Sequence, residues 1–184
     1  MRAMKILKRL VGGVVLLVVL MVAALFLARF RPGANVVNVS VDVNASPDAL
    51  WELISRPELV KKWVPELVET KSETPGKTGV GARDRCVMAM DGERTELVLE
   101  VTKLEPPRRL EMDEWPVGSG EGMFRAHITY ALEPIAGGTR LTESSLTDYR
   151  TYVLKLLEPI ISRSAANMLH KDLQTLKALA EKKP

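Results

Sequence analysis

The stretch YRTYVLKLLEPIISRSAANMLHKDLQTLKALAEKK, Tyr149 to Lys183, reads almost without interruption as helix, and the rest of the chain must fold around it. In its second half, apolar side chains recur at steps of three and four residues: Ala165, Leu169, Leu173, Leu176 and Ala180. This spacing places them on one face of a helix. We therefore expect a long C-terminal helix with one buried face.

The first half of the stretch carries a second apolar stripe, formed by Val153, Leu156, Leu157, Ile160 and Ser164. At 100° per residue the two stripes lie on different sides of the cylinder, so one straight helix cannot bury both against the same partner. Pro159 removes an amide donor and clashes with the preceding turn, which favours a change of direction there. The sequence predicts a short helix, a kink near Pro159 and a long terminal helix.

Near the N-terminus, all nineteen residues from 10 to 28 are apolar or glycine. As a helix this run would measure roughly 28 Å, about the hydrocarbon thickness of a bilayer. The alternative is a cleaved signal peptide ending near Val22-Ala23-Ala24, but its apolar region would normally be only about 7–15 residues long. We predict a transmembrane helix at 10–28, between a cytoplasmic basic flank at 1–9 and a linker at 29–35.

Basic residues are unevenly distributed about this run. Arg2, Lys5, Lys8 and Arg9 precede it, whereas Arg29 and Arg31 follow it. Because positive charge is enriched on the cytoplasmic side, the N-terminus is expected in the cytoplasm and the remaining domain outside it. The short linker would keep that domain close to the bilayer. The first stripe of the C-terminal helix would then face either the membrane or the mouth of a cavity.

The composition restricts the function of the domain. Of the 184 residues, 46% are hydrophobic and 27% charged, as in ordinary globular proteins. The net charge of +3 includes four positive residues before the apolar run. The domain is therefore nearly neutral and lacks the excess of basic residues that is typical of nucleic-acid-binding proteins. One cysteine and two histidines at unrelated spacings make no metal ligand set, and Cys86 is expected in the core. We expect no metal and no cofactor, and the sequence does not indicate which protein partners the chain has.

Residues 36–148 have the pattern of antiparallel strands. Val37 to Val43 alternate apolar and polar side chains, and Ser46-Pro47-Asp48 then has the residues that begin a helix. Asp91-Gly92 between two alternating runs predicts a hairpin, and five or six strands fit between the later turn signals. Each strand has one apolar face, and only the terminal helix is long enough to cover these faces.

This order resembles the START-like superfamily, also called SRPBCC, helix-grip or polyketide cyclase/dehydrase-like proteins. The resembling segments include Val39 to Val43, Ser46 to Trp51, Arg56 to Pro65, Leu104 to Leu110, Tyr130 to Pro134, Gly138 to Thr142 and Leu173 to Lys177. The resemblance covers residues 36–183. It implies an α+β fold in which a curved antiparallel sheet wraps around a long C-terminal helix and encloses a hydrophobic cavity. It implies no single activity, because members bind lipids, sterols, polyketides or hormones and only some are enzymes.

Candidate catalytic groups are few. His127 and His170 are the only side chains whose ordinary pKa suits a general base at neutral pH. Both alternate onto faces that the pattern indicates are polar, and no carboxylate stands at a spacing that would orient either ring. We expect surface histidines and assign no catalytic residue.

Polar groups inside the predicted cavity depend on strand parity. Glu143, Ser145 and Thr147 share a strand face with Leu141, whereas Leu146 lies on the other face. If the first face is inward, Glu143 and Ser145 are polar groups in an apolar chamber, which would orient a ligand or act as acid and base. If the second is inward, they are solvated. Arg83 and Asp84 pose the same alternative.

The most specific prediction is a ligand chamber of roughly 300–1,000 Å³. Its lining is predicted to be Leu53, Trp63, Leu97, Leu99, Leu110, Met112, Phe124, Ile128, Tyr130 and Met168. The first hypothesis is a membrane-anchored domain that binds a lipid or another hydrophobic small molecule. The second is a cyclase/dehydrase- or hydrolase-like enzyme in the same cavity, which requires a buried ionisable group. The third is an interaction protein with a filled interior.

Overall fold

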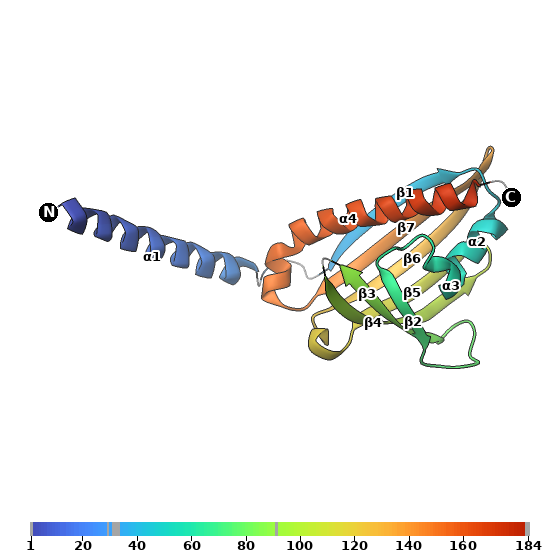
Figure 1. Ribbon diagram of the computed structural model, residues 1–184, viewed down its shortest axis with the longest axis horizontal. Helices are drawn as coiled ribbons and strands as arrows, with labels where there is room; N and C mark the ends of the chain where they lie inside the picture. Colours follow the sequence, from blue (N-terminus) through green and yellow to red (C-terminus); the bar gives the residue numbers. More distant parts are fainter. Residues whose placement is uncertain (1, 29, 31–33, 91, 183–184) are drawn as a thin grey trace.

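The computed structural model describes residues 2–28, 30, 34–90 and 92–182, without the side chains of residues 2–5, 7, 25, 28, 34 and 119 (Figure 1). Two helices frame the chain, α1 (Arg2–Ala28) and α4 (Tyr152–Ala180), and two short helices, α2 (Pro47–Ser55) and α3 (Pro57–Val60), follow the first strand. The strands are β1 (Ala34–Val43), β2 (Leu67–Ser72), β3 (Arg83–Met90), β4 (Glu93–Glu105), β5 (Arg109–Pro116), β6 (Phe124–Ile135) and β7 (Gly138–Tyr149). A 3-10 turn, η1 (Gly118–Gly120), lies between β5 and β6.

The seven strands form one antiparallel sheet in the order β1-β7-β6-β5-β4-β3-β2. From β2 to β7 each strand pairs with the next along the chain, whereas β1 closes the far edge against β7. α4 runs along β1 and β7 on one side of the sheet (Figure 1). We call this side the inner face and the opposite side the outer face. The predicted α+β class, with an antiparallel sheet and a long C-terminal helix, is confirmed.

Several of these elements have local causes that can be read from neighbouring residues. The Ser46 hydroxyl accepts a hydrogen bond from the Ala49 amide at 3.3 Å and Pro47 is the first residue of α2, as the N-cap pattern predicted. β3 and β4 form the predicted hairpin, and Gly92 in its turn has a φ of +85°. Asp91, the other predicted turn residue, lies outside the described residues.

α4 buries one of its two apolar stripes. Leu173 and Leu176 are fully buried and pack with Leu50, Leu141 and Trp63 in the main core cluster, so the second stripe faces the sheet as predicted. In the first stripe, Val153 is 56% exposed and Ile160 is 70% exposed. The helix therefore buries its second apolar stripe against the sheet, and its first apolar stripe stays largely exposed.

The structure has one continuous helix in place of the two predicted C-terminal helices, and the predicted kink near Pro159 stays a prediction. α4 is one helix from Tyr152 to Ala180, with Pro159 inside it. Proline removes one backbone donor, but the turns on both sides keep their own hydrogen bonds, and Thr151 caps the start by accepting from the Leu154 amide at 3.3 Å. Since the first stripe stays exposed and does not pack on the sheet, both halves of the sequence can lie in one helix.

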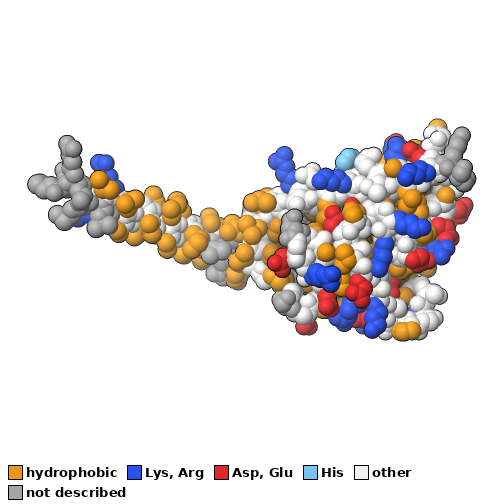
Figure 2. Space-filling model, viewed as in Figure 1, with side chains coloured by type: hydrophobic (Ala, Val, Ile, Leu, Met, Phe, Trp, Pro, Cys, Tyr) orange, Lys and Arg blue, Asp and Glu red, His pale blue; other side chains and the backbone are white. Residues whose placement is uncertain are grey.

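α1 projects from the domain, and its C-terminal end lies near the start of α4 (Figure 1). Its large described apolar side chains are exposed, among them Ile6 at 59% and Leu27 at 64% (Figure 2). Over the described residues, no helix combines the length and the apolar character needed to cross a membrane. The predicted span at 10–28 includes Leu25 and Ala28, whose side chains lie outside the description, and so do residues 29 and 31–33 of the predicted linker.

Candidate functional site

The strand register decides which polar groups of β7 point inward. Glu143 lies opposite Tyr130 of β6 and Val39 of β1, and it is only 3% exposed. Ser145 lies opposite Ile128, another inner-face residue, whereas Leu146 is 42% exposed on the outer face. The inward alternative for Glu143, Ser145 and Thr147 is therefore correct.

Glu143 on β7 and Tyr130 on β6 form a hydrogen-bonded pair on the inner face. The Tyr130 hydroxyl donates a hydrogen bond to Glu143 Oε1 at 3.1 Å, while Glu143 Oε2 is buried without a hydrogen-bond partner among the described residues. Trp63 packs edge-on against the Tyr130 ring with centroids 6.5 Å apart, and its indole N–H donates to the Leu53 carbonyl at 3.0 Å. These contacts hold the tyrosine so that its hydroxyl meets the carboxylate.

The electrostatics of this pair follow from its burial. Loss of solvent raises the pKa of Glu143 to about 8, against the opposing effect of the Tyr130 hydrogen bond and with the support of nearby Asp172 and Glu114. Burial raises the pKa of Tyr130 well above its ordinary value, and the nearby Glu143, Glu114 and Asp172 raise it further. Glu143 therefore holds a proton at neutral pH.

Further acids share this interior. Burial raises the pKa of Glu114 on β5 to about 7. On α4, Asp172 is 5% exposed, and burial together with the neighbouring Glu66 raises its pKa to about 6. Glu66, just before β2, has a buried Oε2 without a partner in the described part of the chain. Four carboxyl groups thus lie at the inner face: Glu143 on β7, Glu114 on β5, Glu66 just before β2 and Asp172 on α4.

The sequence analysis missed Glu114 and Asp172, although each carried a signal. Glu114 alternates with Leu110 and Met112, which places it on their face of β5. Asp172 stands three residues after Leu169 and four before Leu176, within the apolar face of the helix. Asp84 also points inward, opposite Leu99, and burial raises its pKa, whereas Arg83 points outward to Glu100.

The predicted chamber residues lie at different depths. Trp63, Leu110, Ile128 and Tyr130 belong to the buried core cluster, and Leu53 and Met112 pack against it. Leu97 is buried on β4, whereas Leu99, Phe124 and Met168 are half-buried. Their membership of one ligand chamber stays a prediction.

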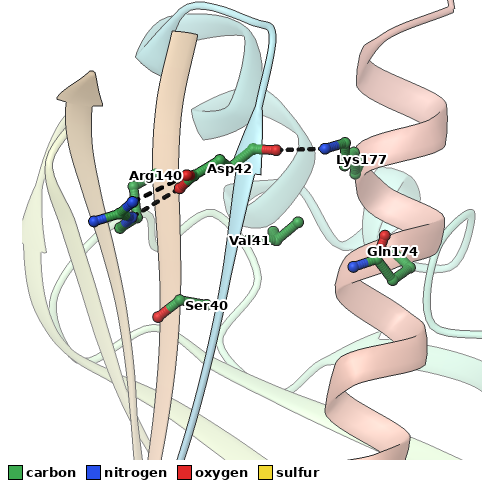
Figure 3. A pocket seen from close by; sticks show the side chains of 6 residues that line it. All are labelled: Ser40, Val41, Asp42, Arg140, Gln174 and Lys177. Atoms are coloured by element: carbon green, nitrogen blue, oxygen red, sulfur yellow. Dashed lines mark hydrogen bonds and ion pairs between the residues drawn. The ribbon is translucent and has the colours of Figure 1, made fainter. Parts of the chain in front are cut away.

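Two surface hollows accompany this interior. One, of about 470 Å³, lies between β1, β7 and α4 and is lined by Ser40, Val41, Asp42, Arg140, Gln174 and Lys177 (Figure 3). Its charged side chains already have partners within the protein. The Arg140 guanidinium donates to both Asp42 carboxylate oxygens at 2.7 and 2.9 Å, and Lys177 Nζ donates to the Asp42 backbone carbonyl at 2.7 Å. The second, of about 500 Å³, lies at the η1 end of the sheet, where Phe124, Pro116 and Leu154 line it.

His127 lies on the outer face, as the alternation predicted, but the expectation that no carboxylate orients its ring is wrong. Its Nδ1 lies 2.8 Å from Asp113 Oδ1, and its Nε2 lies 3.1 Å from Glu111 Oε2. Both acids come from β5, which pairs with β6, and sequence spacing cannot show a neighbour across strands. His170 is exposed, and Cys86 is buried as expected, with a pKa raised by burial to about 11.

Comparison with known proteins agrees with this architecture. The family described as polyketide cyclase / dehydrase and lipid transport matches residues 35–181. The chain belongs to this family. Two uncharacterized proteins of Mycobacterium tuberculosis, MT1597 and Rv1546, are each 30% identical over 105 residues, which cover 57% of this chain and 71% of theirs.

Solved structures of the same fold include two bacterial proteins. One, an uncharacterized protein from Rhizobium leguminosarum, has a TM-score of 0.66 at 14% identity and covers 83% of this chain and 98% of its own. The other, TTHA0849 from Thermus thermophilus, has a TM-score of 0.64 at 19% identity and covers 81% of this chain and all of its own, at 100%. At these identities the likeness establishes the fold alone.

Within this fold, the inner face carries acidic and hydrogen-bonding side chains among apolar ones. Glu143 presents one oxygen that no described side chain satisfies, and Tyr130 positions the carboxyl group. Among the described residues, no group of three His, Cys, Asp or Glu side chains is arranged to hold a metal ion. Buried carboxyl and hydroxyl groups are of the kind that can form hydrogen bonds to an organic ligand or transfer a proton.

Proposed function

We propose that this chain binds a lipid or another hydrophobic small molecule between the inner face of its sheet and α4. The observation that carries the proposal is Glu143, a carboxyl group that is buried on the inner face and has one unpartnered oxygen among the described residues. Burying a polar atom without a partner is costly, so native proteins keep such atoms chiefly where a ligand or water completes them. The family, which is described by lipid transport among other functions, supports the same ligand class.

The test is co-purification followed by thermal unfolding. The full chain, extracted in a non-ionic detergent, is expected to carry a stoichiometric hydrophobic species that native mass spectrometry detects. Ligand that binds only the folded state stabilises it by mass action, so returning the extracted species to stripped protein should raise the melting temperature. Protein that carries no such species, and that no added lipid or sterol stabilises, would remove the support for this proposal.

A second candidate function is acid–base catalysis on a hydrophobic substrate, as in a cyclase/dehydrase- or hydrolase-like enzyme. The observation that favours it is the pair of inner-face acids whose pKa values lie near neutrality, about 8 for Glu143 and about 7 for Glu114. Such values suit a group that must both give and take a proton. Conversion of the co-purified species by wild-type protein but not by Glu143→Gln, with binding retained, would favour the enzyme; an unchanged species would favour the binding protein.

We also propose that residues 10–28 anchor the chain in a membrane, with the N-terminus in the cytoplasm and the domain outside it. The exposed apolar side chains of α1 and the excess of basic residues before this run support the proposal. Membrane fractionation tests the anchor, since the full chain should pellet with membranes and resist alkaline extraction.

Fusion of reporters to the C-terminus tests the orientation. A reporter that is active only in the cytoplasm should be silent, and one that is active only outside it should give a signal. Strong activity of the cytoplasmic reporter would reverse the assigned topology.

A further inference from the structure

The first half of α4 carries apolar side chains that the fold leaves exposed. We propose that this segment, residues 152–160, lies in the surface of a lipid bilayer, so that the domain touches the membrane with the end from which α1 projects. The inference rests on the proposed membrane anchor, because it concerns a second contact with the same bilayer. It adds an orientation of the domain that the anchor alone does not set.

The exposed face of α4 changes in character along its length. Val153, Leu157 and Ile160 follow one another at steps of four and three residues, and they are 56%, 40% and 70% exposed. The same face continues through Ser164 and Asn167, which are exposed and polar. A helix face that meets only water is normally polar along its whole length. The apolar part therefore indicates that the first turns of α4 have different surroundings from the rest of the helix.

The apolar part of this face points away from the sheet. Behind it, the Asn35 side-chain amide near the start of β1 donates to Glu158 Oε1 and, at 2.7 Å, to Ser162 Oγ. Since an α-helix turns by 100° at each residue, Glu158 and Ser162 lie on the side of α4 opposite Ile160. These hydrogen bonds join the first half of α4 to β1 and keep the exposed apolar side chains outward.

The same end of the domain adjoins α1. The C-terminal end of α1 lies beside the start of α4, and the two helices are in contact (Figure 1). On the outer face of the sheet, Val36 near the start of β1 pairs with Leu146 near the end of β7, and these side chains are 52% and 42% exposed. Figure 2 shows hydrophobic side chains continuing from α1 onto the adjoining end of the domain. Apolar surface thus lies on both sides of the sheet at the end where the proposed anchor would leave the bilayer.

The charges around residues 152–160 fit lipid head groups. Arg150 precedes the segment and Arg163 follows it, and both are exposed. Glu158, the one acid between them in the sequence, lies on the opposite side of the helix. Basic side chains next to an apolar helix face are typical of segments that lie in a membrane interface, where acyl chains contact the apolar residues and anionic head groups attract the cations. Tyr152, 58% exposed in the first turn, is of a residue type that is enriched at this interface.

A second copy of the chain fits this surface less well than a bilayer does. Stable protein interfaces bury roughly 800 Å² on each partner. The four large apolar side chains that the segment exposes are 40–70% exposed. Even at the roughly 250 Å² of a large aromatic side chain, they would together offer less than about 600 Å². A bilayer requires no such minimum, because the binding of an amphipathic helix strengthens with the apolar area that it buries.

The experiment measures how deep single residues lie in the bilayer. Full-chain variants Ile160→Cys, Asn167→Cys and Val18→Cys are labelled with the fluorophore NBD and reconstituted in vesicles of phosphatidylcholine and phosphatidylglycerol. Cys86 is buried, and burial raises the pKa of its thiol to about 11, so it stays unlabelled in the folded protein. Lipids that carry a nitroxide at a known depth then quench each label that lies at that depth.

The label at Ile160 is expected to be quenched about 5–10 Å below the surface, as for an interfacial helix. The label at Val18, in the middle of the proposed anchor, should be quenched near the centre of the bilayer. Asn167 is the matched control, since it is exposed on the same face of α4 and lies about 10 Å farther along the helix axis. Its label should stay in water and keep its fluorescence. Val153→Cys repeats the measurement at a second exposed apolar position.

The possible failures can be told apart. Quenching at Val18 with an unquenched label in water at Ile160 would overturn the docked orientation and leave the anchor standing. Absence of quenching at both positions would overturn the anchor and, with it, this inference. A label at Ile160 that is shielded from water but not quenched by the lipid nitroxides would assign the surface to a protein partner, such as a second copy. Equal quenching at Ile160 and Asn167 would contradict the change of surroundings along α4.

Discussion

The substitution Glu143→Gln is expected to change how the stability of this protein depends on pH. Glutamine has nearly the same shape as a protonated glutamic acid, so it can keep the hydrogen bond from Tyr130 and the packing around it. It cannot ionise. The comparison of the two proteins therefore isolates the free energy of holding a carboxyl group at this buried position.

The magnitude follows from the difference between the pKa values of Glu143 in the folded and unfolded states. The folded value is about 8 and the ordinary value is 4.5. Because the folded state holds the proton more tightly, the contribution of Glu143 to stability is fully present below about pH 4.5 and is lost as the pH rises through about 8. At about 1.4 kcal/mol for each pKa unit, the loss amounts to roughly 5 kcal/mol above both values, as an upper bound.

The assay is urea unfolding of the full chain in a non-ionic detergent, followed by tryptophan fluorescence across a series of pH values. The free energy of unfolding of Glu143→Gln minus that of wild type should grow steadily with pH between these two values. Glu133→Gln, whose side chain is exposed, should give a difference that does not depend on pH. Parallel curves for Glu143→Gln and wild type would refute the reasoning, since they would mean that Glu143 is ionised in the folded protein.

Three further predictions test the packing. Leu173→Ala, at a fully buried position, should lower the free energy of unfolding by about 2–5 kcal/mol, whereas Ile160→Ala, 70% exposed on the same helix, should change it by less than about 0.5 kcal/mol; equal losses would contradict a single buried stripe. Gly138→Ala should cost about 3 kcal/mol or more in thermal or urea unfolding, because the added Cβ would lie 2.1 Å from the Val43 carbonyl oxygen, and a stable Gly138→Ala would show that β1 and β7 separate easily there. Ala126→Trp, on the inner face, should leave the protein folded but abolish the stabilisation by ligand if a chamber is present, and unfolding of this variant would instead indicate a filled interior.

The inner face shows where prediction from sequence reached its limit. Alternation placed Glu143, Ser145 and Thr147 on one face of β7, but both faces carried candidates for the core, so parity alone could not choose between them. The pairing of Glu143 with Tyr130 on one side and Val39 on the other decides the matter. Likewise, Asp113 and His127 are fourteen residues apart, and only the register of β5 and β6 makes them hydrogen-bond partners.

The elements that follow from the sequence alone are those with a local cause. The period of the apolar residues after Ala165, the cap at Ser46 and the turn at Gly92 each act within a few residues, and the structure has the helix, the helix start and the hairpin that they predicted. Tertiary structure decided what depends on residues far apart in the chain. It kept α4 continuous through Pro159, since the first apolar stripe was not required to meet the sheet. It also brought Glu143, Glu114 and Asp172 from two strands and a helix into one interior. There burial raises the pKa of Glu143, and Glu114 and Asp172 raise it further because little water screens them.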